Sequence, residues 1–280
     1  MEQSFGAGEA HIGRQSGGKV VFTRGAETFM ERNQMKVQWQ GEVVSVQPRS
    51  AVWRYLIDNR THREYGYNVF LKGEVRFNDE TVHLDNKFDK YDYCVAVSEK
   101  QAVKAGISIG DIIKGTGWTK KYPEIEFADF YRAGSLKKLK AAETSHSTAM
   151  SIEIDTVNTR YDGTPIPRVN SADYPGPPWK QAVPPLEIYA WRGERMLSKA
   201  AWKGKCFQCI WANMANVTIQ YDFDNNLVRN RFETFCYGPL SCKNYKMGPA
   251  RAVPYKGMSG VKDQGWLDEI CVEYRRDEDE

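Results

Sequence analysis

Four cysteines in two pairs are the residues of this chain whose spacing most clearly indicates chemistry. Two residues separate Cys206 from Cys209, and five separate Cys236 from Cys242. Two intervening residues place both sulfurs of a pair on one side of a tight turn, and the wider second loop contains a glycine and a proline that allow a sharp reversal. Four thiolates can surround one Zn²⁺ ion tetrahedrally and leave no position open for water or substrate. The spacing therefore predicts a structural zinc site.

An iron–sulfur cluster, reduced thiols or disulfides are the alternatives for the same four cysteines. The first residues lack the basic and apolar segments of a signal peptide, and no apolar run approaches the roughly 18 residues that cross a bilayer. We therefore expect a cytoplasmic protein without a membrane partner, in which thiols stay reduced. Disulfides are then the weaker alternative. Cys94 and Cys271 lie in segments with strand-like or apolar patterns, and we expect them to be core residues.

The segment between the two cysteine pairs is predicted to be a hairpin. Residues Val217–Phe223 and Asn230–Cys236 alternate between apolar and polar types and flank the turn sequence DNNLVR. Such a hairpin brings the far ends of the two pairs together. We assign residues 192–275 to a small zinc-binding β domain.

The N-terminal half has the strand pattern of a small barrel. Four runs rich in β-branched and aromatic residues precede a short helical segment, EKQAVKAG, and a glycine-containing strand that begins at the Gly110-Asp111 turn. The first run ends in this interpretation at Pro48, because proline cannot donate to a central ladder. One helix before the last strands is the order of a Greek-key barrel. We therefore predict an OB-like barrel over residues 37–140, with Gly115 and Gly117 allowing the strand to bend.

Three further segments complete the predicted domain plan. Residues 1–35 are glycine-rich and are interpreted as a flexible arm, and residues 276–280 as an acidic tail. Residues 141–191 contain seven prolines between Pro165 and Pro185, which excludes a regular helix or a central strand. This segment is either a semi-rigid linker or an extended arm packed on a neighbour, and its tryptophans favour packing.

Aromatic and basic residues alternate on the second and third predicted strands, as a single-strand-binding surface requires. Aromatic rings would stack on bases while cations contact phosphates. Trp53 and Tyr55 would share one face, as would Tyr65 and Tyr67, if the strands alternate regularly. The alternative is that these aromatics are simply the barrel core. The candidate nucleic-acid-binding residues of this half are Arg49, Trp53, Arg54, Tyr55, Arg63, Tyr65 and Tyr67.

The predicted zinc domain adds a second basic surface. From Arg192 to Lys262 there are 12 basic and 4 acidic residues, whereas from Asp263 to Glu280 there are 8 acidic and 2 basic ones. Candidate phosphate contacts are Lys243, Lys246 and Arg251. Compensation of the negative four-thiolate site, or an ordinary solvated surface, would also explain these cations.

The cysteine block GKCFQCIWANMANV…RFETFCYGPLSCKNYKMGPARAVPYKG…WLDE, together with Val43–Arg49 and Gly66-Tyr67, resembles a group of uncharacterised prokaryotic proteins with the same paired cysteines. The resemblance covers most of residues 38–271. It implies the same two-part domain plan and no activity.

These observations predict a mostly β, non-catalytic protein that binds single-stranded DNA or RNA and contains a structural zinc. No spacing of the four histidines indicates a metalloprotease, and no nucleophile motif is present. Two alternatives stay open. The chain could be a protein-interaction subunit of a larger complex, or an enzyme whose site lies between the two domains.

Overall fold

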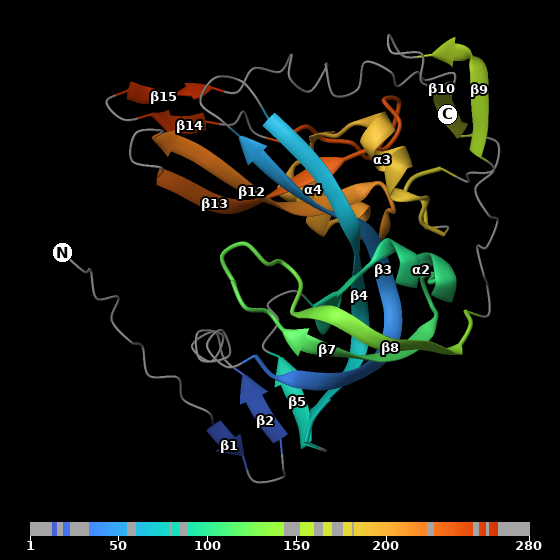
Figure 1. Ribbon diagram of the computed structural model, residues 1–280, viewed down its shortest axis with the longest axis vertical. Helices are drawn as coiled ribbons and strands as arrows, with labels where there is room; N and C mark the ends of the chain where they lie inside the picture. Colours follow the sequence, from blue (N-terminus) through green and yellow to red (C-terminus); the bar gives the residue numbers. More distant parts are fainter. Residues whose placement is uncertain are drawn as a thin grey trace.

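The protein is mostly β in a computed structural model, and its main sheet has 11 strands in the order β1-β2-β5-β4-β6-β8-β7-β3-β12-β13-β11 (Figure 1). The structure describes residues 13–15, 19–22, 34–54, 60–78, 80–84, 89–142, 152–159, 165–169, 176–180, 182–222, 227–248, 252–255 and 258–262. Most of the predicted arm and the whole acidic tail lie outside these ranges. The predicted β class is confirmed.

The two longest strands, β3 (Lys36–Arg54) and β4 (Arg60–Phe77), pair with each other along nearly their whole length. Their pairing contains two bulges, at Val43/Ser45 and at Arg49/Ser50. A bulge bends a strand and strengthens its twist. The predicted strand end at Pro48 is wrong, because β3 continues through the proline to Arg54. The neighbouring bulge explains why proline is tolerated there.

Five strands of the main sheet close into a ring, because β4 pairs with β3 as well as with β6. The ring runs β4-β6-β8-β7-β3 and back to β4, and it adds β6 (Tyr93–Val97), β7 (Ile112–Thr119) and β8 (Phe130–Lys140). The β6–β8 contact is parallel and the other pairings of the ring are antiparallel. Trp39 is buried against β7, where a β-carbon on Gly115 would lie 2.5 Å from its ring. This predicted bending glycine thus makes room for an indole.

The predicted helix is α2 (Glu99–Ala105), which connects β6 to β7. Ser98 and Gln101 form a capping box at its start. The helix ends at Gly106, whose φ of 54° is the left-handed conformation that glycine adopts without strain. Both boundaries agree with the sequence prediction.

The part of the chain from Leu186 onward, called the C-terminal part below, contributes strands to the same sheet as the ring. Its hairpin strands β12 and β13 are antiparallel, and β12 also pairs in parallel with the far end of β3, from Asn216↔Ala51 to Ile219↔Arg54. In the chain, short helices and the short edge strand β11, which pairs with β13, precede this hairpin. The elements are α3 (Leu186–Arg192), β11 (Arg195–Met196), α4 (Lys199–Lys203), the 3₁₀ helix η2 (Lys205–Gln208), β12 (Ala212–Asp222) and β13 (Leu227–Cys236).

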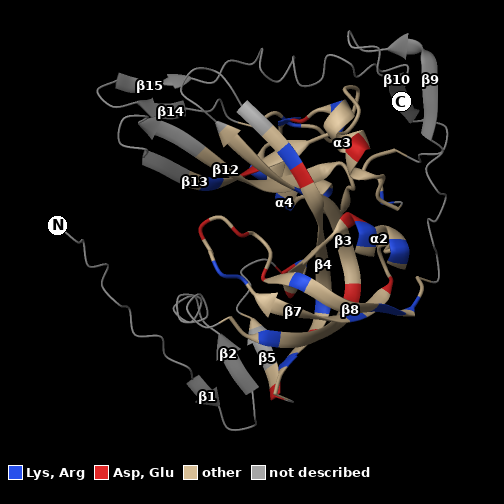
Figure 2. Ribbon diagram, viewed as in Figure 1, with Lys and Arg blue, Asp and Glu red and all other residues tan. Residues whose placement is uncertain are grey.

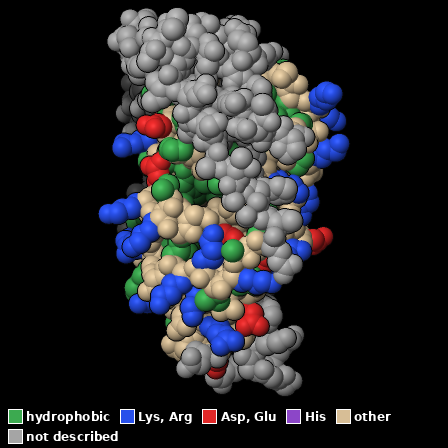
Figure 3. Space-filling view, turned by 90° about the vertical axis from the view of Figure 1, so that its right-hand side faces the viewer, with side chains coloured by type: hydrophobic (Ala, Val, Ile, Leu, Met, Phe, Trp, Pro, Cys, Tyr) green, Lys and Arg blue, Asp and Glu red, His purple; other side chains and the backbone are tan. Residues whose placement is uncertain are grey.

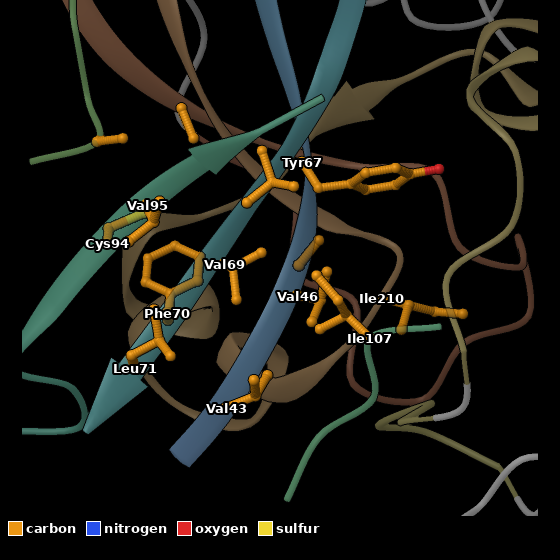
Figure 4. Close-up of a cluster of buried hydrophobic side chains, with 14 of the residues drawn as sticks. Val43, Val46, Tyr67, Val69, Phe70, Leu71, Cys94, Val95, Ile107 and Ile210 are labelled. Carbon is orange, nitrogen blue, oxygen red and sulfur yellow. The ribbon is translucent and has the colours of Figure 1, made fainter. Parts of the chain in front are cut away.

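The C-terminal part covers part of the outward face of β3 and β4. Ser45 Oγ and Gln47 Nε2 both donate to the carbonyl oxygen of Phe207, at 2.5 and 2.6 Å. The ring of Phe70 lies 5.1 Å from that of Phe207 and 6.3 Å from that of Trp202. Figure 4 shows side chains of β3, β4 and β6 in one cluster. One core therefore joins the segments predicted as separate domains.

The described part of the proline-rich segment packs as an arm. Trp179 is buried and its carbonyl accepts a hydrogen bond from Ile210 N at 2.9 Å. Tyr67 Oη donates to the carbonyl of Pro184 at 2.5 Å. The remaining strands are short. They are β1 (Gly13–Gln15), β2 (Lys19–Phe22), β5 (Glu80–Leu84), β9 (Ile152–Thr159), β10 (Pro165–Val169), β14 (Ala252–Tyr255) and β15 (Met258–Lys262).

Replacing Phe70 with alanine should destabilise both halves of the chain together. The change removes a buried phenyl group that contacts both the five closed strands and the C-terminal part. It should lower the free energy of unfolding by about 3–5 kcal/mol. Denaturant unfolding should stay a single transition by circular dichroism and by tryptophan fluorescence. Leu139→Ala, at a side chain that is 46% exposed, is the control. Two separate transitions, with one unaffected, would contradict a shared core.

Candidate functional site

Two arginines and two tyrosines form a continuous stack on the surface of the ring. The guanidinium of Arg63 lies 5.8 Å from the ring centroid of Tyr65. Arg49 follows, 5.9 Å from Tyr65 and 5.7 Å from Tyr131. Each distance is within the range of a cation–π contact. We call Arg63, Tyr65, Arg49 and Tyr131 the ladder.

A bulge explains why Tyr65 faces outward. Arg49 pairs with Gly66 and Ser50 with Glu64, so Tyr65 is the extra residue on β4. A bulged residue leaves the regular alternation, and its side chain is redirected. Tyr65 is 47% exposed as a result, whereas Tyr67 is fully buried.

The ladder ends in a cleft of about 450 Å³. The cleft lies between the start of β8, the loop that precedes it, and the start of α2. Its lining combines three cations with two tyrosines and one acid. It consists of Gln34, Arg49, Ala96, Ser98, Gln101, Lys121, Tyr122, Glu126, Tyr131, Arg132 and Ala133.

The positive charge of the cleft is largely unbalanced. Arg49 and Arg132 form no ion pair with any carboxylate of the described residues, and the buried Nε of Arg49 has no hydrogen-bond partner among them. Glu126, the one acid of the lining, accepts hydrogen bonds from the backbone of Lys121 and Tyr122 at 2.5 and 2.7 Å. Its carboxylate therefore stabilises the loop. The cleft can accept an anionic group.

Two further details suit the cleft to a ligand. Arg132 has a φ of 53°, and a non-glycine residue in the left-handed region is strained in a way that recurs at functional sites. Burial raises the pKa of Tyr131 well above its usual range, so that its hydroxyl stays protonated. The phenol is then a neutral ring that can stack or donate.

Of the residues predicted to bind nucleic acid in the N-terminal half, the structure joins three in the ladder: Arg49, Arg63 and Tyr65. Trp53 is 39% exposed farther along β3. Tyr67 is in the core and donates to Pro184, so it cannot stack on a base. The side chain of Arg54, and the whole of Tyr55, lie outside the described residues.

The predicted contacts of the C-terminal part are less well grouped. Lys243 and Lys246 are exposed near Cys242, and Arg251 is outside the described residues. Two other arginines of this part have structural roles. Arg192 Nε donates to the carbonyl of Tyr237 at 2.7 Å, and Arg195 donates to the carbonyl of Pro239. They hold the loop between Cys236 and Cys242.

The four paired cysteines lie close enough to affect one another. None of the four forms a disulfide, and only Cys242 is more than slightly exposed. Burial, together with the charges of Cys236 and Cys242, raises the pKa of Cys206 to about 12. Burial and Cys236 also raise the pKa of Cys209 well above its usual range. The thiols of Cys206 and Cys209 therefore lie near that of Cys236, at the end of β13.

Backbone groups already point at the sulfurs. Gly238 N donates to Cys236 Sγ at 3.3 Å. Hydrogen bonds from the backbone of Trp211 and Trp179 lower the pKa of Cys209, although burial outweighs them. Within the described residues, no three His, Cys, Asp or Glu side chains are already grouped so as to hold a metal ion. The chemistry of the donors, four sulfurs with N–H donors behind them, fits a soft cation such as Zn²⁺.

A buried acid–base network lies where β4 meets the C-terminal part. His62 Nδ1 is 2.9 Å from Glu194 Oε1, and His62 Nε2 is 2.6 Å from Tyr237 Oη. Tyr237 Oη also donates to Glu64 at 3.1 Å. Burial raises the pKa of Glu64. The side chains of His62, Glu64 and Glu194 are at most 8% exposed, so this network fills the junction instead of opening to a substrate.

Sequence reasoning missed Lys121, Tyr122, Tyr131 and Arg132, which are four of the eleven residues that line the cleft. They lie in the segment KKYPEIEFADFYR, which leads from β7 into the start of β8 and contains four aromatic and three basic residues. That signal was present, but only the ring closure brings it to Arg49. The glutamate partners of His62 had no sequence signal.

Comparison of the chain with protein-family models, curated proteins and solved structures gave no match. Within the described residues, no helix has both the length and the apolar character needed to cross a membrane.

Replacing Glu194 with alanine should lower the free energy of unfolding by about 1–3 kcal/mol, because the change removes the carboxylate 2.9 Å from the buried Nδ1 of His62. Chemical denaturation measures this loss. Glu187→Ala is the matched control, since Glu187 is exposed on α3 and its loss should change stability by less than about 0.5 kcal/mol. If Glu194→Ala changes the free energy of unfolding as little as Glu187→Ala does, the network contributes no stability.

Proposed function

We propose that this chain is a non-catalytic protein that binds single-stranded nucleic acid along the ladder and in the cleft. The observation that carries the proposal is the alternation of guanidinium groups and tyrosine rings from Arg63 to Tyr131, which ends in a cationic cleft. Bases stack on aromatic rings and on guanidinium planes, while cations contact the phosphates between them.

We also propose that residues 37–140 are an OB-like barrel. The ring has five strands, which in chain order are β3, β4, β6, β7 and β8. The α2 helix lies between the third and fourth of them, and the third and fifth meet in parallel. OB folds are five-stranded, partly open Greek-key barrels that bind oligonucleotides through the face of strands 2–3 and adjoining loops. The strand order and the helix position support this assignment.

The C-terminal part restricts where such a barrel could bind a ligand. It covers Phe70 on the outward side of β4, which is one of the two strands of the usual binding face. The loop between β7 and β8 stays at the surface, with Tyr122 41% exposed. Basic side chains also gather on the ring half of one face (Figure 3). The loop, the ladder and the cleft therefore remain available to a nucleic acid.

We further propose that Cys206, Cys209, Cys236 and Cys242 hold a structural Zn²⁺ ion in the cytoplasm, where thiols stay reduced. The ion would offset the mutual repulsion that the four sulfurs meet as thiolates. It would link η2 to the end of β13, and its chemistry would be structural because four sulfurs leave no open position. An iron–sulfur cluster is the alternative occupant.

A protein-interaction role is the second candidate. Leu240 and Met247 are 37% and 68% exposed on either side of Cys242, and such apolar groups suit a docking surface. Co-purification with one protein after nuclease treatment would favour it. An enzyme is the third candidate, since Glu64 and Glu194 converge on His62. The filled junction around these residues argues against it.

Removing rings or cations from the ladder should weaken binding to single-stranded oligonucleotides in two distinguishable ways. Tyr65→Ala removes a stacking ring and should cost about 1–3 kcal/mol in binding free energy. Arg63→Gln removes a phosphate contact and should reduce the slope of log K against log salt by about 0.7. Fluorescence anisotropy at several salt concentrations measures both.

Lys199→Gln, on α4, is the control for charge and should have little effect. If wild-type protein shows no affinity for single-stranded DNA or RNA at low salt, nucleic-acid binding is excluded. Equal losses in the Arg63 and Lys199 variants would instead place binding away from the ladder.

Purified protein should contain about one zinc ion per chain and be colourless, since one four-thiolate site binds one ion. Cys206→Ser and Cys236→Ser should lose the metal and lower the melting temperature, as should chelation of the wild type. Elemental analysis and absorbance spectra test this. Cys94→Ala should keep the metal, because Cys94 is buried in the ring. A brown protein, or one with full metal content after both changes to serine, would overturn the assignment.

A further inference from the structure

A second cationic hollow lies on the outward face of β3, β4, β7 and β8. It has a volume of about 340 Å³ and is separate from the cleft, with which it shares no lining residue. Three cations and one acid surround it, together with amide and hydroxyl side chains. Its lining is Gln38, Trp39, Gln40, Glu74, Arg76, Lys114, Gly115, Thr116, Ser135 and Lys137.

Strand register explains how these side chains meet. Gln40 pairs with Glu74 on one side and with Lys114 on the other, and Lys114 pairs with Lys137. A second row runs from Arg76 through Gln38 to Thr116. Residues two apart on a strand share a face, so both rows project from the same side of the sheet. Basic positions recur along these strands in Figure 2.

The charges that line the hollow destabilise the folded sheet. Lys114 and Lys137 lie directly opposite each other, and like charges at that position destabilise a sheet. Neither forms an ion pair with a carboxylate of the described residues. Glu74 pairs with Arg76 at 3.1 Å, but both side chains are more than half exposed and the pair stabilises little. An anion between the two lysines would remove their repulsion.

The backbone at the hollow is also strained. Ser135 has a φ of 49°, within the left-handed region that non-glycine residues seldom adopt. It follows Gly134, which pairs with Thr116 where the β7–β8 register shifts. The irregularity places the Ser135 hydroxyl and backbone at the hollow, where the strain is compatible with a binding role.

We propose that this hollow binds phosphate groups, with Lys114 and Lys137 as the principal contacts. Ammonium, amide and hydroxyl groups all donate to phosphate oxygens. Trp39, the one aromatic residue of the lining, is only 2% exposed, so no ring is available to stack on a base. The hollow therefore recognises phosphate alone, either in a nucleic-acid backbone or in free polyphosphate.

Two titrations distinguish these sources. In ¹H–¹⁵N spectra of the full chain, sodium tripolyphosphate should shift the amide signals of Gly115, Thr116 and Ser135. The double change Lys114→Gln/Lys137→Gln should weaken that binding by on the order of tenfold, as removal of charge-assisted contacts does. Lys199→Gln/Lys203→Gln, on the exposed face of α4, loses the same charge and should leave the shifts and the affinity unchanged.

The second titration uses a single-stranded oligonucleotide. If the hollow holds backbone phosphates, the Lys114/Lys137 change should reduce the salt slope by about 1.4, which is two contacts at about 0.7 each. An unchanged slope with weakened tripolyphosphate binding assigns the hollow to free polyphosphate. If the wild type binds no oligonucleotide, the proposed function is rejected. The tripolyphosphate titration then tests the hollow by itself. The phosphate site is overturned if neither ligand shifts the three amides, or if both double variants bind alike.

Discussion

The carbonyl oxygen of Phe207 is the acceptor on which the arrangement of this protein depends. Ser45 and Gln47 point outward from β3 and are fully buried, so both need hydrogen-bond partners. The one carbonyl supplies a partner to both, and Trp202 Nε1 donates to the other end of Gln47 at 3.0 Å. These polar contacts fix α4 and η2 on the ring. The outward face of β3 and β4 around Ser45, Gln47 and Phe70 thereby becomes interior, and ligand binding is restricted to the remaining surface.

Local patterns predicted the elements of this fold well, because they depend on neighbouring residues. The α2 helix with its Gly106 end and the hairpin of β12 and β13 follow from capping and alternation. The role of Tyr67 was not predictable in the same way. Alternation places Tyr65 and Tyr67 on one face, but the bulge opposite Arg49 separates them into an exposed and a buried ring. A bulge depends on the partner strand, which the local sequence does not specify.

The cleft shows a second limit of sequence reasoning. Arg49 and Tyr131 are 82 positions apart and meet only because the ring closes through β6 and β8. The same closure explains the basic hollow on the other strands, where register, and not sequence proximity, places Lys114 against Lys137. Charge counts pointed to the C-terminal part as the basic surface. Two of its arginines, Arg192 and Arg195, instead donate to backbone carbonyls, whereas Arg49 and Arg132 of the ring form no ion pair with a carboxylate of the described residues.

The cysteines are physically connected to the covered face of the ring, because η2 contains both Cys206 and Phe207, whose carbonyl contacts that face. Cys206 directly precedes Phe207, and Cys209 N donates to the carbonyl of Cys206 at 3.0 Å, so this turn sets the direction of the Phe207 carbonyl. Any ion that holds Cys206 and Cys209 to Cys236 would restrain the acceptor on which Ser45 and Gln47 depend. A structural metal would then influence the ligand surface without contacting it, by keeping the C-terminal part on the ring. With the C-terminal part held in this position, Phe70 would stay covered and the ladder would stay exposed.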